Sequence, residues 1–116
     1  MGVSGKLLIH VAQKESWNAA IGNAANFIKA GRSGEDLEIR IVANGDSVTS
    51  CAPCQADLLD RLTMLSNHGV GIFLCENSLR SHGIAVSSLA PILRTVPAGI
   101  RALVELQGEG WRYVRP

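Results

Sequence analysis

The chain has 116 residues, of which 47% are hydrophobic and 18% charged, and its formal net charge is +1. This length and balance predict one globular domain over residues 1–116 rather than a disordered chain. The basic residues are scattered and the longest apolar run falls short of the roughly 20 residues of a membrane span, so we expect neither a nucleic-acid nor a membrane partner.

Apolar runs and amphipathic segments alternate along the chain. In chain order they predict a strand at 6–12, a helix at 16–31, a strand at 37–43, a long loop at 44–54, a helix at 55–69, a strand at 70–75, short helical turns at 76–93, a brief strand within 94–99, a helix at 98–110 with Pro97 at its first turn, and a final strand at 111–116. Strands that alternate with helices predict an α/β fold, with a mostly parallel sheet and helices on both faces. The pattern does not predict the strand order.

The N-terminal segment lacks the long apolar stretch and cleavage site of a secretory signal, so we expect a cytoplasmic protein. In that compartment the three cysteines would be reduced thiols, ligands or redox groups rather than structural disulfides. The charged fraction is low for a free surface, which favours an oligomer.

All three cysteines fall where the predicted strands end. In parallel α/β sheets, ligands bind in the crevice beyond the carboxyl ends of the strands. Three segments are expected to lie at this crevice. They are the end of the first strand at residues 10–13, the loop at 44–54 and the turn at 75–77. This clustering is the strongest functional signal in the pattern.

Cys75 ends a buried apolar run and begins a polar turn. If the turn starts a helix, its N–H groups and dipole would favour a thiolate at that position. The alternative is a small buried hydrophobe, which is a common role for a free cysteine.

Cys51 and Cys54 form a C-x-x-C pair ahead of the second predicted helix. A redox pair, with the first thiol acidified at the helix N-terminus, is one interpretation. Half of a metal site and two loop thiols are the others, but the chain has no second C-x-x-C or H-x-x-x-H motif, so we expect no metal. No Walker loop, G-x-G-x-x-G or G-x-S-x-G motif occurs either, and we expect no cofactor.

Four more residues support the candidate site. His10 lies late in the first strand and is either a core histidine or an acid, base or partner for a sulfur anion. Asn44 and Gly45 follow the second strand and are also ordinary turn formers. Asn77 lies in the turn after Cys75.

The order of these residues resembles that of the DsrE/DsrF-like proteins, small α/β proteins associated with intracellular sulfur transfer. The resemblance covers nearly the whole chain. It is carried by His10, "AIGNAANFI" with Asn23 and Asn26, "VANGDSV", "CENSL" and "VPAGIRALVELQGEGWRYVRP".

The resemblance implies a three-layer α/β/α domain with a five-stranded sheet, assembled as a homo-oligomer, often a trimer or hexamer. It also implies that Cys75 carries sulfur as a persulfide, as a sulfurtransferase or sulfur carrier with a donor or acceptor protein as partner. "CAPC" is not typical of the family and keeps a dithiol redox protein open as an alternative. A non-catalytic oligomer that binds a small ligand is the third hypothesis.

Overall fold

The structure is a computed structural model that describes residues 4–116, so the first three residues of the expected domain lie outside the described residues. The main elements are β1 (Ser4–Val11), α1 (Trp17–Lys29), β2 (Asp36–Ala43), α2 (Ala56–Asn67), β3 (Gly71–Cys75), α3 (Glu76–Ser81), β4 (Arg94–Val96), α4 (Gly99–Gly108) and β5 (Arg112–Val114). Short 3-10 helices occur at η1 (Lys14–Ser16), η2 (Gly45–Ser50) and η3 (Val86–Ser88).

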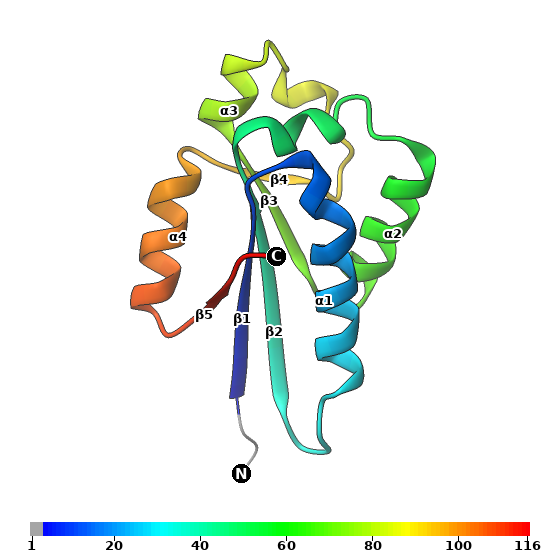
Figure 1. The fold of residues 1–116 in the computed structure, drawn as a ribbon, viewed down its shortest axis with the longest axis vertical. Coiled ribbons are helices and arrows are strands. Elements are labelled where there is room, and N and C mark those ends of the chain that lie inside the picture. The colour runs from blue at the N-terminus through cyan, green and yellow to red at the C-terminus, as the bar shows by residue number, and fades with distance from the viewer. Residues whose placement is uncertain (1–3) are drawn as a thin grey trace.

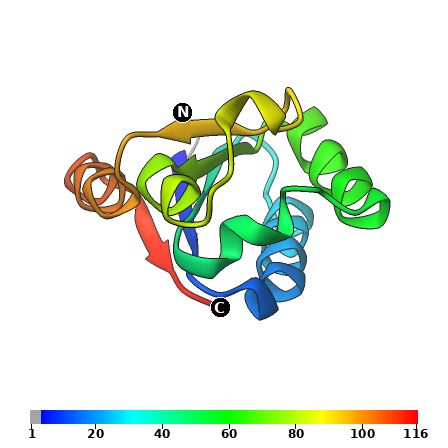
Figure 2. The same ribbon diagram turned by 90° about the horizontal axis from the view of Figure 1, so that it is seen from above.

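The five strands form one parallel sheet in the order β4-β3-β2-β1-β5. Helices α1 and α2 cover one face of the sheet and α4 covers part of the other, while α3 lies beyond the carboxyl end of β3 (Figures 1 and 2). This arrangement confirms the predicted three-layer α/β/α fold. None of the helices described in residues 4–116 is long and apolar enough to cross a membrane.

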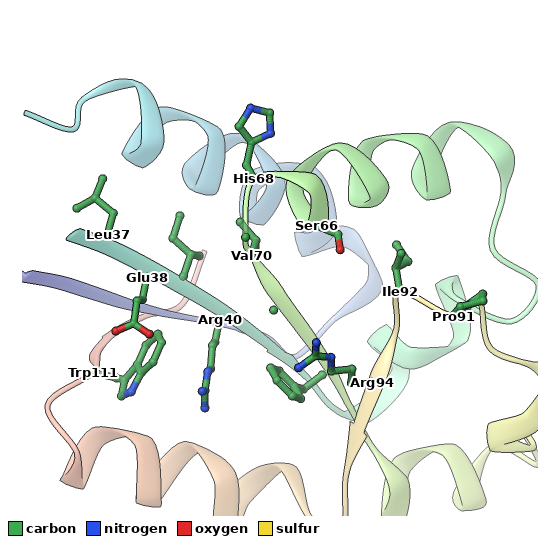
Figure 3. Close-up of a pocket in the computed structure, with 14 residues that line it drawn as sticks. Leu37, Glu38, Arg40, Ser66, His68, Val70, Pro91, Ile92, Arg94 and Trp111 are labelled. Carbon is green, nitrogen blue, oxygen red and sulfur yellow. The ribbon is translucent and has the colours of Figure 1, made fainter. Parts of the chain in front are cut away.

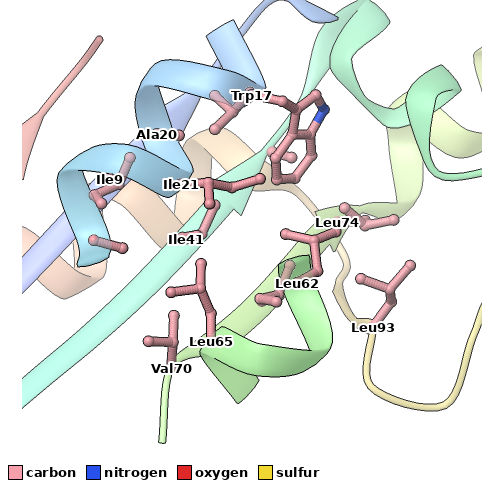
Figure 4. Close-up of a cluster of buried hydrophobic side chains, with 14 of the residues drawn as sticks. Ile9, Trp17, Ala20, Ile21, Ile41, Leu62, Leu65, Val70, Leu74 and Leu93 are labelled. Carbon is pink, nitrogen blue, oxygen red and sulfur yellow. The ribbon is translucent and has the colours of Figure 1, made fainter. Parts of the chain in front are cut away.

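Side chains of the central strands alternate between two hydrophobic cores. The larger core lies between the sheet and α1 and α2 (Figure 4), and includes Ile9, Trp17, Ile41, Leu62 and Leu74. The smaller core lies under α4 and consists of Leu8, Val42, Leu103, Leu106 and Trp111, with Phe73 packed against it.

The same alternation determines which face each site residue occupies. His10 lies two positions after Leu8, and Cys75 lies two positions after Phe73. Both side chains therefore belong to the α4 face, near the carboxyl edge of the sheet.

Two local expectations differ from the structure. Pro97 lies ahead of α4 rather than in its first turn, because the helix begins at Gly99 with Ala98 as the N-cap. The expected loop at 44–54 contains the 3-10 helix η2. The other predicted strands and helices are present, with bounds shifted by a few residues.

Candidate functional site

Cys75 is the last residue of β3 and the N-cap of α3. Its backbone pairs with Val96 on β4, which fixes the thiol at the carboxyl edge of the sheet. The residue is 5% exposed. The strand therefore holds the sulfur atom in a rigid and nearly covered position.

Backbone N–H groups from two helices point at the sulfur. The N–H of Ser78 in α3 donates to Cys75 Sγ at 3.4 Å, and the N–H of Gly99 in α4 donates to it at 3.2 Å. These are N–H groups of helix first turns, which have no partner inside the helix and favour an anion. The sulfur thus lies where the N-termini of α3 and α4 converge.

The hydroxyl of Ser78 adds a third donor. Its Oγ accepts a hydrogen bond from the N–H of Gly45 at 2.9 Å, so its own hydrogen is free to point elsewhere. That hydroxyl is also hydrogen-bonded to the Cys75 side chain. Ser78 therefore connects the turn after β2 to the thiol at the end of β3.

These contacts determine the acidity of the thiol. Burial alone would raise the pKa of Cys75, because it penalises the charged form. The Ser78 hydroxyl and the backbone N–H groups of Gly99, Ser78 and Asn77 act in the opposite direction, and the pKa falls below its ordinary value of 9.0. A larger fraction of the thiol is therefore ionised near neutral pH than for a free cysteine.

Two glycines allow the backbone to approach this closely. Gly45 has a φ of +61°, which disfavours other residues. A Cβ atom on Gly99 would lie 3.2 Å from the Cβ atoms of both Asn44 and Cys75 and 3.6 Å from Cys75 Sγ. Gly99 thus lets the start of α4 come up against the thiol.

His10 lies beside this arrangement in a chain of side-chain hydrogen bonds. Its Nε2 lies 2.8 Å from Asn44 Oδ1, and its Nδ1 lies 2.5 Å from the hydroxyl oxygen of Tyr113 on β5. The imidazole is 9% exposed, and both ring nitrogens have a partner. His10 is therefore linked by a hydrogen bond to Asn44, which lies beside Cys75.

Asn77 contributes through its backbone rather than its side chain. Its N–H is one of the groups that lower the Cys75 pKa, whereas its side-chain oxygen accepts from Arg80. The neighbouring Glu76 carboxylate accepts from the Thr95 hydroxyl at 2.6 Å, so Thr95 on β4 holds this negative charge.

Cys51 and Cys54 form a different environment. Cys51 is 2% exposed and belongs to the larger core. Burial, charge repulsion by Cys54 and a hydrogen bond with Cys54 raise the pKa of Cys51 to about 12. Burial also raises the pKa of Cys54, although the Cys51 hydrogen bond opposes it. Both thiols are free.

The structure does not place Cys51 as the redox interpretation of this pair requires. Helix α2 begins at Ala56, with Gln55 as its N-cap, so Cys51 does not lie at the helix N-terminus. Its thiol is therefore shielded from water rather than acidified. Within residues 4–116, no group of three or more His, Cys, Asp and Glu side chains lies close enough to hold a metal ion.

A cavity of about 490 Å³ lies over the amino-terminal halves of β2 and β3 (Figure 3), and Cys75 does not line it. Its walls include Arg40 and Arg94, whose guanidinium groups lie 5.6 and 5.9 Å from the centre of the Phe73 ring. Arg40 also lies 4.8 Å from the centre of the Trp111 ring. The aromatic rings therefore hold both guanidinium groups against the uncovered part of the sheet.

The site combines predicted residues with residues that the sequence did not reveal. Cys75, Asn44, Gly45, Asn77 and His10 lie along the carboxyl edge of the sheet, whereas Cys51 lies in the core. Sequence reasoning missed three contributors: Ser78, Gly99 and Tyr113. The "CENSL" motif contains Ser78, but nothing in the chain order indicates that Gly99 or Tyr113 reaches the site.

The fold and the site together define a class of α/β protein in which a nearly buried thiol lies at the carboxyl edge of a parallel sheet. A model of the DsrE/DsrF-like family matches residues 7–116. The chain belongs to the DsrE/DsrF-like family.

One solved structure has the same fold over almost its full length. It is a protein of unknown function, MTH1491 from Methanobacterium thermoautotrophicum, with 24% sequence identity and a TM-score of 0.85. The match covers 98% of this chain and 99% of that chain. No curated protein matches the chain.

Proposed function

We propose that this protein carries or transfers sulfur as a persulfide on Cys75. The observation that carries the proposal is the convergence of Gly99 N–H, Ser78 N–H and the Ser78 hydroxyl on one sulfur atom. Such donors favour an anionic sulfur, and the thiolate is the nucleophile in sulfur exchange. Membership of the DsrE/DsrF-like family supports the same chemistry.

The transfer step needs no oxidant. The Cys75 thiolate attacks the outer sulfur of a donor persulfide, R–S–SH. A new S–S bond forms to Sγ while the S–S bond of the donor breaks, and its electron pair leaves on R–S⁻. The products are Cys75–S–SH and the donor thiolate, and the reverse exchange with an acceptor thiolate unloads the carrier.

The raised pKa of Cys51 makes a dithiol redox function the weaker alternative. A dithiol exchange requires one thiol of the pair to be ionised near neutral pH. Burial opposes ionisation of both Cys51 and Cys54. We therefore assign the chemistry to Cys75 and a packing role to the pair.

We also propose that the protein is a homo-oligomer that uses the outer surface of α4. Ile100 and Val104 lie one turn apart on this helix and are 68% and 61% exposed. Helix α4 packs on β1 and β2, and Phe73 on β3 is only partly buried beside it. A second copy of the chain would cover both apolar surfaces, in a trimer or hexamer as the family resemblance implies.

The test is to incubate the purified protein with a persulfide donor and to map the mass of each cysteine peptide. We expect the mass of one sulfur atom to be added to the Cys75 peptide. Cys75→Ser should abolish the addition, whereas the matched control Cys54→Ser should keep it. Circular dichroism should show that both variants fold. The absence of added sulfur on wild-type Cys75 would refute the proposal.

A further inference from the structure

Three side chains form a hydrogen-bonded chain that crosses the sheet toward the candidate site. Tyr113 on β5 contacts His10 on β1, and His10 contacts Asn44 at the end of β2. Strand β1 lies between β5 and β2 in the sheet. The two hydrogen bonds therefore link side chains from three neighbouring strands. Tyr113 is 40% exposed while His10 is 9% exposed, and the chain therefore runs from the surface inward.

The chemistry of the three groups fixes the direction of each hydrogen bond. The side-chain oxygen of Asn44 only accepts, so His10 Nε2 carries a hydrogen and donates to it. In a neutral imidazole the other ring nitrogen is then an acceptor, and Tyr113 donates its hydroxyl hydrogen to Nδ1. Asn44 consequently turns its oxygen toward His10 and its amide N–H₂ group away from it.

Asn44 and Cys75 are neighbours across the sheet edge. Ala43 pairs with Leu74 in the parallel register of β2 and β3, and Asn44 and Cys75 are the next residue on each strand. By alternation both side chains belong to the α4 face. A Cβ atom on Gly99 would lie 3.2 Å from the Cβ atoms of both residues, so the missing side chain of Gly99 leaves space between them.

We propose that Tyr113 and His10 are positioning residues that hold Asn44 with its amide N–H₂ turned toward the anionic sulfur of Cys75. This inference rests on the proposed sulfur chemistry and deepens it. The amide stabilises the thiolate, and after transfer it stabilises the outer sulfur of the persulfide, which has lost its proton to water. Without the hydrogen bonds from Tyr113 to His10 and from His10 to Asn44, the amide is free to rotate and present its oxygen, which repels an anion. The site thereby selects the ionised form of the sulfur it carries.

Other charged groups at this edge do not substitute for the amide. Thr95 holds the Glu76 carboxylate on the β4 side, and Asn77 holds the Arg80 guanidinium.

A double-mutant cycle tests the inference without a sulfur donor. The variants are Asn44→Leu, Tyr113→Phe and the pair together, and the measurement is the pH profile of iodoacetamide alkylation at Cys75, resolved by peptide mass spectrometry. We expect Asn44→Leu to slow alkylation at pH 7 by about fivefold, because it removes the oriented amide dipole beside the charged sulfur. Tyr113→Phe should slow it by about two- to threefold, since it acts through two intermediates.

The coupling between the two substitutions decides the outcome. Tyr113→Phe should have no further effect in the Asn44→Leu background, because its influence passes through that amide. Val114→Ala, on the same strand and 39% exposed, should leave alkylation unchanged. Independent effects of the two variants, or no effect of Asn44→Leu, would overturn the inference. A wild-type protein that takes up no sulfur would refute the persulfide function and leave this cycle readable.

Discussion

The backbone N–H of Gly99 lies 3.2 Å from the sulfur of Cys75, although 24 residues separate them in the chain. The Ser78 N–H also donates to this sulfur. The first turns of α3 and α4 therefore both contact the Cys75 sulfur atom. A strand end fixes the sulfur, and the two helices supply partial positive charge to it.

Ser78→Ala should raise the pKa of Cys75 by about one unit, because it removes a hydroxyl donor to the sulfur. It also leaves the Gly45 N–H without its acceptor, which should cost about 1 kcal/mol of unfolding free energy. The pH profile of Cys75 alkylation and urea denaturation measure the two effects. Ser81→Ala is the control, since that exposed hydroxyl contacts only the Asn77 carbonyl; equal pKa shifts in both variants would contradict the role of Ser78.

Gly99→Ala should also raise the Cys75 pKa. Its Cβ would press on Asn44 and Cys75 at 3.2 Å, so the start of α4 must shift by a few tenths of an ångström and lengthen the N–H contact to sulfur. Gly108→Ala in the same helix meets no atom within 4 Å and should leave the pKa unchanged. Alkylation profiles that coincide for wild type and Gly99→Ala would show that the close approach is unimportant.

The pattern of the chain predicted the sheet and the place of Cys75, because both follow from local information. Apolar runs indicate buried strands. Because helices alternate with these strands, the sheet is parallel and the strands all end at the same edge. Gly99 and Tyr113 remained hidden, because their roles depend on strand order and on the path of α4. The pattern does not encode either feature within any one segment.

The C-x-x-C pair shows what a motif leaves undecided. The motif and the nearby helix left an acidic thiol at Cys51 open as one interpretation, but the 3-10 helix η2 carries this residue into the core before α2 begins. Motif spacing alone does not report burial, and burial determines the pKa at this position.

Stability should fall as the pH rises above 9, and Cys51 should account for part of the fall. Its pKa is about 12 in the folded protein, against an ordinary value of 9.0. Between these values the unfolded chain loses the proton that the native thiol retains, so unfolding becomes more favourable by up to about 1.4 kcal/mol per pH unit. Below pH 9 both states keep the proton and the dependence disappears.

Urea denaturation at pH 8, 9 and 10 measures this dependence. Cys51→Ala should be less stable at pH 8, because it leaves a small gap in the core, but its unfolding free energy should decline less steeply with pH. Parallel declines for the variant and the wild type would mean that Cys51 ionises normally in the folded state.

Val104→Glu should dissociate the proposed oligomer to the 12.3 kDa chain, because it places a charge within an apolar contact. Met64→Glu on α2 is the matched control, since Met64 is 64% exposed and Val104 is 61% exposed. Light scattering coupled to gel filtration gives the mass of each variant. A wild-type mass equal to one chain, or an unchanged mass for Val104→Glu, would argue against this surface.

The position of Gly99 late in the chain has a consequence for synthesis. During translation Cys75 leaves the ribosome before α4 exists, so the growing chain holds the thiol without its second helix terminus. Until α4 docks, only the α3 donors acidify the sulfur, and Asn44 lacks the His10–Tyr113 support that β5 completes. The Cys75 thiol therefore acquires its full set of hydrogen-bond donors only when the last helix has folded onto the sheet.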